Sequence, residues 1–419
     1  MKKNRISRFI ISITAAVCCM TCMINTASPV VLSAEQENNS LMVFEKHTPE
    51  EICEYIKNHP SDTNTLSVYT ENPSLTVPYS TGKISDETLQ NALNSINVIR
   101  YICGLQEVTL KNEYNEQCQA AALVNALNGT ISHYPARPSG ISDELYKIAY
   151  NAASSSNLGW NHNNIPSSVL SYMADSGASN ISSVGHRRWI LNPTMKQTGF
   201  GNVGRSYSMY AFDNYSAKAT EKGIVWPALN TPVEYFINRP TAWSISIGKA
   251  VNISDITVTV TDKDNGQEWK FTENSSDGDF YVNNEYYGQS GCIIFRPDGI
   301  KCNAGRLYDV HIEGLSEDIS YTVNFFSLKD YETGLLGDIN NDGLINAVDS
   351  SLVLGEYSSL STDGTSVLND AERKAADVNK DSFVDAVDAS YILMYYAYVS
   401  TETEEIPIDE FINKINAEE

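Results

Sequence analysis

The spacing of hydrophobic residues changes its period part-way along the chain. Between residues 85 and 127, apolar residues such as Leu89, Leu93 and Ile96 recur at intervals of three or four. This spacing predicts helices that bury one face. From residue 243 the period becomes two, in seven short runs separated by Asp, Asn and Gly: SISIG, ITVTVT, EWKFT, FYVNN, CIIFRP, YDVHIEG and YTVNFFSL. Such alternation predicts an antiparallel β-sandwich, because each strand would turn one face to a core and the other to solvent.

A helix start precedes this region. Thr48, Pro49 and Glu51 form the pattern of an N-cap residue, a first-turn proline and the acid of a capping box, directly ahead of the run ICEYIK. The three residues predict a short helix, because each satisfies or removes a backbone N–H group that a helix start leaves unbonded. Residues 60–83 are rich in Ser, Thr, Pro and Asn, and we expect them to be extended.

The first residues have the pattern of a secretory signal peptide. A basic head, MKKNRISR, precedes the apolar run FIISITAAVCCMTCMI and then small residues up to Ala34. This order predicts a signal peptide over residues 1–34, cleaved between Ala27 and Ala34. No later stretch is long and apolar enough to suggest a membrane span. We therefore expect a secreted, extracellular protein.

The net charge is −23, and it is concentrated at the C-terminal end. Residues 335–419 hold 18 acidic and 4 basic residues, which is −14 of that total. A local excess of acid argues against a nucleic-acid partner, because phosphate backbones bind basic surfaces.

Eight cysteines are present, and three of them lie in the expected signal peptide. Cys292 and Cys302 are near enough in sequence to staple a β-hairpin, although free thiols are equally compatible with the odd number that remains. The mature chain would keep Cys53, Cys103, Cys118, Cys292 and Cys302.

Two acidic loops of twelve residues lie near the C-terminus. The first, DINNDGLINAVD, runs from Asp338 to Asp349, and the second, DVNKDSFVDAVD, runs from Asp377 to Asp388. Both place side-chain oxygens at positions 1, 3, 5, 9 and 12 and a backbone carbonyl at position 7, as a Ca²⁺ ion requires. The ligands of two calcium ions would be Asp338, Asn340, Asp342, Leu344, Asn346 and Asp349 in the first loop, and Asp377, Asn379, Asp381, Phe383, Asp385 and Asp388 in the second.

The loops differ at position 6, where the backbone must turn sharply. Gly343 occupies this position in the first loop and Ser382 in the second. Because glycine adopts such a turn without steric cost, we expect the second loop to be the more strained.

The repeated loop, followed each time by an apolar helix and ending in Asp rather than the Glu of an EF-hand, resembles the type I dockerin module. The resemblance covers residues 335 to about 400. It implies a small all-α domain that binds calcium and docks on cohesin modules of cellulosome scaffold proteins. Recognition in this family falls largely on loop positions 10 and 11 and on the exposed helix face behind them. Positions 10 and 11 are here Ala347 with Val348 and Ala386 with Val387. The identical pairs suggest docking in two orientations, although they could also be plain helix starts.

Three segments of the helical region resemble the CAP superfamily in its bacterial SCP-like branch. They are SHYPARP around His133, SSNLGW at residues 155–160 and VGHRRWILNP at residues 184–193. The resemblance implies an α-β-α sandwich with a central cleft, which two histidines and two glutamates line in well-studied relatives. His133 and His186 match the histidines, which implies a possible divalent metal such as zinc, and Asn157 lies where the first glutamate is expected.

The expected acids of this cleft are missing. No glutamate precedes His186 closely, and Asp175 is the nearest acid. Because two histidines alone make a weak metal site, the pair could equally be hydrogen-bonded without any ligand. Of Arg187 and Arg188, which follow on the same helix, we expect at most one to enter the cleft and the other to be a surface or salt-bridge residue.

Together these patterns predict a multidomain α+β protein. The expected parts are a signal peptide (1–34), an N-terminal helix and extended segment (35–84), a CAP-like domain (85–234), an antiparallel β-sandwich (235–330) and a dockerin with an acidic tail (331–419). The dockerin would bind a cohesin in a calcium-dependent way. The CAP-like domain would be a non-catalytic binding or accessory module in polysaccharide breakdown, with polysaccharide or cell wall as a possible ligand. The alternative is a hydrolase of polysaccharide, peptidoglycan or peptide that uses His133 and His186.

Overall fold

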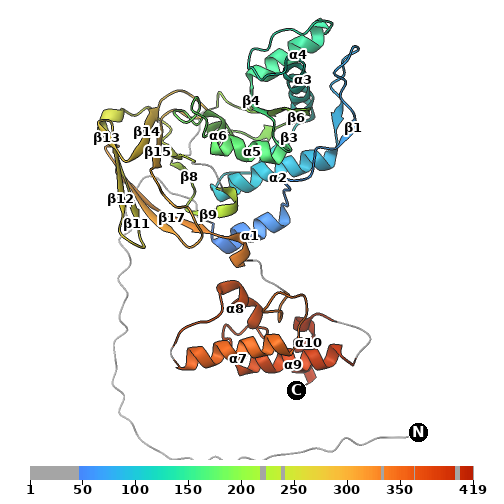
Figure 1. Cartoon of the computed structure of the whole chain (residues 1–419), viewed down its shortest axis with the longest axis vertical. Helices are drawn as coiled ribbons and strands as arrows, with labels where there is room; N and C mark the ends of the chain where they lie inside the picture. The colour runs from blue at the N-terminus through green and yellow to red at the C-terminus, as the bar shows by residue number, and fades with distance from the viewer. Residues whose placement is uncertain are drawn as a thin grey trace, which may run out of the picture. The chain divides into compact units, whose positions relative to one another are not determined.

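The structure is a computed structural model that describes residues 47–217, 223–236, 241–331, 335–362, 364–401 and 406–418 (Figure 1). The expected signal peptide lies outside the described residues. No helix in these ranges is long and apolar enough to cross a membrane.

The N-terminal elements follow the predicted capping pattern. Helix α1 (Pro49–Asn58) starts with a capping box, in which the Thr48 amide donates to Glu51 Oε2 at 2.8 Å and the Glu51 amide donates to Thr48 Oγ1 at 3.2 Å. The predicted helix near Ser85 is confirmed as α2 (Asp86–Ile102), with Ser85 as its N-cap. Between them, β1 (Tyr69–Glu71) pairs with β2 (Lys83–Ile84) in an antiparallel ribbon.

A three-stranded antiparallel sheet and four helices form the next region. The sheet has the order β4 (Ser156–Trp160), β7 (Ser206–Tyr210), β6 (Phe200–Val203). Helix α3 crosses the sheet very closely, since a Cβ atom at Gly201 would lie 2.2 Å from the Cys118 backbone. The other elements are α3 (Asn112–Asn128), α4 (Asp143–Ser154), α5 (Ile165–Ala174), α6 (Gly185–Ile190) and the two short parallel strands β3 (Thr109–Leu110) and β5 (Gln197–Thr198).

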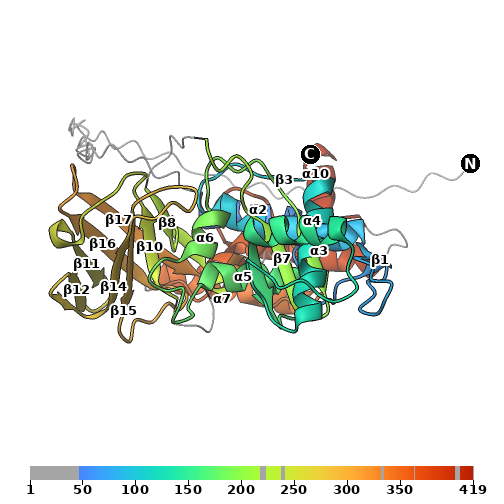
Figure 2. The ribbon, with the colours of Figure 1, turned by 90° about the horizontal axis from the view of Figure 1, so that it is seen from above.

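Two larger sheets follow, and all seven runs with period two are strands. Figure 2 shows these strands gathered together, in yellow to orange. One sheet has the order β14-β15-β10-β8 and the other β13-β12-β11-β16-β17-β9. Aromatic residues of the two sheets meet in one core, where the Trp243 ring lies 5.7 Å from Tyr308 and 5.9 Å from Phe325. The strands are β8 (Ile224–Trp226), β9 (Asn230–Pro232), β10 (Trp243–Ser246), β11 (Thr257–Asp262), β12 (Glu268–Thr272), β13 (Ser275–Ser276), β14 (Gly278–Asn283), β15 (Cys292–Pro297), β16 (Leu307–Glu313) and β17 (Ile319–Phe326).

Two strands of these sheets come from before residue 235, where the sequence pattern placed the boundary. Strand β8 pairs with β10 in one sheet, and β9 runs parallel to β17 in the other. Each has only three residues, so neither shows an alternation that a sequence pattern could reveal.

Cys292 and Cys302 are free thiols in the structure. Cys292 is buried in β15 and Cys302 is half-buried, and no disulfide joins them. The staple considered from the sequence is therefore absent, and the free-thiol alternative describes the structure.

The C-terminal region is helical and has its own core. Helices α7 (Ala347–Thr362) and α9 (Ala386–Val399) each follow one acidic loop, as predicted, and α8 (Asp370–Ala376) ends where the second loop begins. The expected acidic tail is in part a helix, α10 (Ile408–Glu418), whose Ile408, Phe411 and Ile412 are buried against the core of this region. The tail therefore contributes to packing, which its many acids did not suggest.

Candidate functional sites

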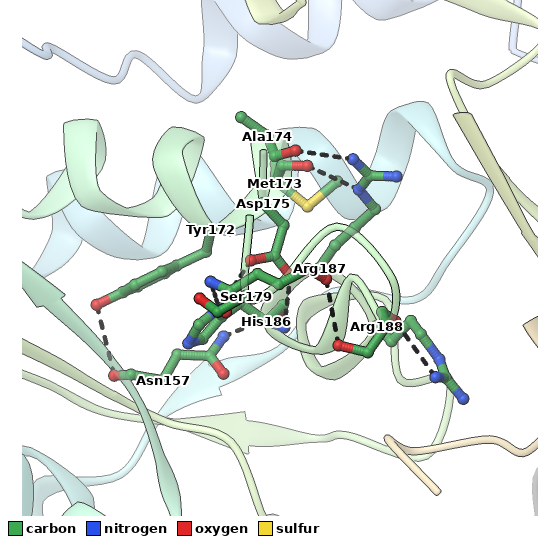
Figure 3. A network of polar contacts seen from close by, with 11 residues as sticks. Asn157, Tyr172, Met173, Ala174, Asp175, Ser179, His186, Arg187 and Arg188 are labelled. Atoms are coloured by element: carbon green, nitrogen blue, oxygen red, sulfur yellow. Dashed lines mark hydrogen bonds and ion pairs between the residues drawn. The ribbon is translucent and has the colours of Figure 1, made fainter. Parts of the chain in front are cut away.

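His186 is held in a fixed orientation by Asp175 (Figure 3). The carboxylate lies at the end of α5 and is almost fully buried. Asp175 Oδ1 lies 2.9 Å from the ring atom His186 Nδ1, and Asp175 Oδ2 accepts a hydrogen bond of 3.0 Å from the His186 amide. Both oxygens of one carboxylate therefore bind the same residue, which fixes the imidazole and leaves Nε2 as the ring atom that can meet a ligand.

Neighbouring side chains complete this site. The Tyr172 ring stacks on His186, with centroids 5.4 Å apart and 24° between the planes. Asn157 donates a hydrogen bond of 3.0 Å from its side-chain amide to the His186 carbonyl, and Asn180 Nδ2 lies 3.4 Å from His186 Nδ1. The structure thus brings two predicted residues, Asn157 and His186, together with Asp175. No motif singled out Tyr172, and only its aromatic character in an apolar helix could have suggested it.

His133 lies in a different environment. Its Nδ1 atom is 2.8 Å from the Ala153 carbonyl oxygen. Within the described residues, no hydrogen bond or ring contact joins His133 to His186. The zinc site expected from these two histidines therefore has no support in the structure.

The prediction for Arg187 and Arg188 is wrong, because neither lies on the surface and, among the described residues, no ion pair involves either of them. Arg187 is fully buried and donates to the Met173 and Ala242 carbonyls, both at 2.7 Å, and to Ser244 Oγ at 2.9 Å. Burial lowers the pKa of Arg187 to about 10, and the charge of Asp175 opposes that shift.

Arg188 is buried in the same way. It donates to Asn283 Oδ1 at 2.8 Å and to the Glu285 and Gln289 carbonyls at 2.7 Å. Apart from the Met173 carbonyl, these acceptors come 55 to 101 residues later in the chain, which local sequence reasoning could not foresee.

The two acidic loops have the same hydrogen-bond pattern. In the first loop Asp349 accepts from the amides of Ile339 at 2.8 Å and Asn346 at 2.9 Å, and Asp338 accepts from the Gly343 amide at 2.8 Å. In the second loop Asp388 accepts from Val378 and Asp385, both at 3.0 Å, and Asp377 accepts from Ser382 at 3.0 Å. In each loop the carboxylate at position 1 therefore accepts from the amide of position 6. The carboxylate at position 12 accepts from the amides of positions 2 and 9.

Two family models match the chain. Residues 93–215 match that of the cysteine-rich secretory protein family, CAP, and residues 336–395 match that of the dockerin type I domain. The chain carries a CAP domain and a type I dockerin domain. The dockerin match covers both acidic loops, and the CAP match covers His133, Asn157 and His186.

A solved structure is also similar to part of this chain. A crystal structure of an extracellular protein containing an SCP domain, from Bacillus anthracis str. Ames, is 17% identical, with a TM-score of 0.24. The match covers 30% of this chain and 40% of that chain, so this chain spans less than half of that protein's length. No curated protein matches.

The carboxylates of the dockerin domain lie where a cation would stabilise them. Burial raises the pKa of Asp388 to about 6, and the nearby charge of Asp377 raises it further, although backbone hydrogen bonds oppose this. A positively charged ion between these groups would remove the repulsion. Carboxylate, amide and carbonyl oxygens are the donors that Ca²⁺ prefers, so the residues present fit that ion.

The residues at loop positions 10 and 11 of the dockerin domain are exposed. Val348 is 54% exposed and Val387 is 48% exposed, and Ala347 and Ala386 are exposed as well. They are helix starts, but they do not contribute to the core.

Proposed function

We propose that the dockerin domain attaches this secreted chain to a cohesin module of a cellulosomal scaffold protein, and that calcium is required for the attachment. The observation that carries the proposal is the duplication of the loops. In both loops the first and last carboxylates accept hydrogen bonds from backbone amides at corresponding positions. Calcium would be held by the six predicted ligands of each loop. It would supply the charge that lets the buried Asp388 remain ionised beside Asp377.

The surface behind the loops has the same internal symmetry. Four exposed apolar positions recur at an interval of 39 residues in the two halves. Exposed apolar side chains that repeat in this way favour a partner surface over chance exposure. The pairs are Leu344 and Phe383, Val348 and Val387, Leu354 and Leu393, and Tyr357 and Tyr396.

Two equivalent faces predict a specific binding experiment. If the cohesin uses either half equally, Val348→Asp alone removes one of two modes and weakens binding only about twofold. Val348→Asp with Val387→Asp removes both, and a buried charge at the centre of the interface should weaken binding by roughly 30-fold or more. Surface plasmon resonance against a panel of cohesin modules in calcium measures both effects.

Val68→Asp is the matched control, because Val68 is 52% exposed but lies outside the dockerin domain. Its affinity should equal that of the unchanged chain. A double variant that binds as tightly as the unchanged chain would contradict the proposed face.

For the CAP domain we propose a binding or accessory role in polysaccharide breakdown, with polysaccharide or cell wall as its ligand. Asp175 supports this role because both of its oxygens are used to hold His186. Within the described residues, no second carboxylate contacts His186, whereas hydrolysis of a glycosidic bond ordinarily uses two.

A hydrolase acting on polysaccharide, peptidoglycan or peptide is the second candidate, and the Asp175–His186 pair is the observation that favours it. A histidine oriented by a buried carboxylate is suited to accept a proton. Incubation with glycan, peptidoglycan and peptide substrates separates the two roles. Turnover that disappears in His186→Ala but persists in His59→Ala would favour the hydrolase, and binding without turnover would favour the accessory role.

The architecture that accompanies this function is also a proposal. It consists of a cleaved signal peptide, residues 1–34, an N-terminal segment, an α-β-α CAP domain, an antiparallel β-sandwich and the dockerin domain. Because β8 and β9 pair within the two large sheets, we place the start of the β-sandwich near residue 223 rather than 235.

A further inference from the structure

A histidine and two carboxylates meet at the turn between β16 and β17, far from the sites described above in sequence. One ring nitrogen of His311 and one carboxylate oxygen each of Glu313 and Asp318 lie within 4.8 Å of one another. In β16 the side chains of Tyr308, Val310 and Ile312 are buried, so the alternation of the strand turns His311 and Glu313 to the opposite, solvent-facing side.

The strand register places two like charges opposite each other. Ile312 pairs with Ile319 and His311 pairs with Ser320, so Glu313 and Asp318 are the next facing positions, at the mouth of the turn. Like charges at facing positions of an antiparallel pair destabilise it. Within the described residues no Lys or Arg forms an ion pair with either carboxylate, and the nearby Lys249 donates to Ser316 Oγ instead, at 3.1 Å.

The imidazole of His311 is held by a hydroxyl group. Its Nδ1 atom lies 2.8 Å from Ser320 Oγ, and its Nε2 atom lies 3.8 Å from Glu313 Oε1. When Nδ1 carries the proton and donates it to Ser320, the lone pair of Nε2 is on the side of the carboxylates. Histidine ligands of metal ions are oriented in this way by a partner at the other ring nitrogen.

We propose that His311, Glu313 and Asp318 form a binding site for a divalent transition-metal ion, with Zn²⁺ as the best match. One imidazole and two carboxylates are ligands that Zn²⁺ accepts, and three protein ligands leave a position for water or for a group of a partner. The ion would neutralise the facing carboxylates of Glu313 and Asp318 and stabilise the turn between β16 and β17. Because Ca²⁺ takes oxygen ligands, the imidazole distinguishes this site from the loops of the dockerin domain.

Isothermal titration calorimetry of the full-length chain with Zn²⁺ tests the site. Excess Ca²⁺ is present so that the loops of the dockerin domain are occupied. We expect His311→Ala to weaken one zinc-binding event at least about tenfold, since even partners of metal ligands contribute that much. Asp318→Asn should also weaken it, and because Asp318 is an exposed turn residue this variant keeps the fold. Circular dichroism and thermal unfolding without zinc verify the fold of both variants.

His59→Ala is the matched control. His59 Nε2 also lies 3.8 Å from a glutamate oxygen, that of Glu107, but within the described residues no second carboxylate joins this pair. The control should bind zinc as the unchanged chain does, and so should a His133→Ala, His186→Ala double variant. Zinc binding that is unchanged in Asp318→Asn and His311→Ala, or that falls equally in His59→Ala, would overturn the proposal.

Discussion

Exchange of the position-6 residues between the two dockerin loops tests how the backbone sets calcium affinity. Gly343 has φ of +86°, and Ser382 has φ of +72° at the corresponding position. Both residues are thus in the left-handed region, which is costly for a residue with a Cβ atom. A Cβ atom at Gly343 would meet nothing within 4 Å, so the exchange changes backbone preference without creating a clash.

The size of the effect follows from two opposing contributions. A residue with a Cβ atom costs about 1–2 kcal/mol more than glycine in the left-handed region. Glycine also makes the unfolded loop more flexible, which offsets about 0.4–1 kcal/mol of that gain. A net value of about 0.5–1 kcal/mol remains. Because calcium binding is coupled to ordering of the loop, this net free energy corresponds to a roughly two- to fivefold change in calcium affinity.

Ser382→Gly should therefore tighten calcium binding at the second loop, and Gly343→Ser should weaken it at the first by a similar factor. Competition titration of the full-length chain against a fluorescent chelator, fitted to two sites, measures both. Lys380 and Asn341 offer an internal control at position 4, with φ of +60° and +56°. Since asparagine tolerates this region better than lysine, Lys380→Asn should also tighten the second site. Weaker calcium binding in Ser382→Gly would refute the reasoning. So would calcium affinities that stay the same in all three variants.

Three further predictions concern single groups. Arg187→Ala should lower the free energy of unfolding by roughly 3 kcal/mol or more, because it leaves several buried carbonyls without a donor, whereas Arg205→Ala, at an exposed side chain, should change little in urea unfolding. The raised pKa of Asp388, about 6, favours the folded metal-free domain at low pH, and that stabilisation is lost as pH rises through 6. Calcium must displace the same proton, so calorimetry should show affinity at the second loop falling as pH drops from 7 to 5. Asp175→Asn should loosen the hold on His186, so NMR relaxation should show a more mobile imidazole in this variant than in the unchanged chain.

Local patterns predicted the elements whose own residues show a regular spacing or a capping motif. The capping box at Thr48, the seven strands with period two and the helix after each acidic loop are all present in the structure. In each case neighbouring residues satisfy the backbone or form one apolar face, which sequence spacing records directly.

Patterns failed where the partner is distant in sequence. The burial of Arg187 depends on hydrogen-bond acceptors up to 57 residues away, and strand β9 exists because β17 supplies its partner. Asp175 was recognised as the nearest acid, but its contact with His186 comes from the path of the chain between α5 and α6. Helix α10 was not predicted, because its many acidic residues suggested a solvent-exposed tail. Phe411 and Ile412 are nevertheless spaced to reach the core.

Calcium uptake by the full-length chain tests the central claim most directly. Isothermal titration should register two Ca²⁺ ions per chain, and Asp349→Ala with Asp388→Ala should remove both while far-ultraviolet circular dichroism shows a loss of helix. Val68→Asp should leave both measurements unchanged. A chain that takes up no calcium, or whose helix content and cohesin binding are the same in calcium and in chelator, would contradict the account.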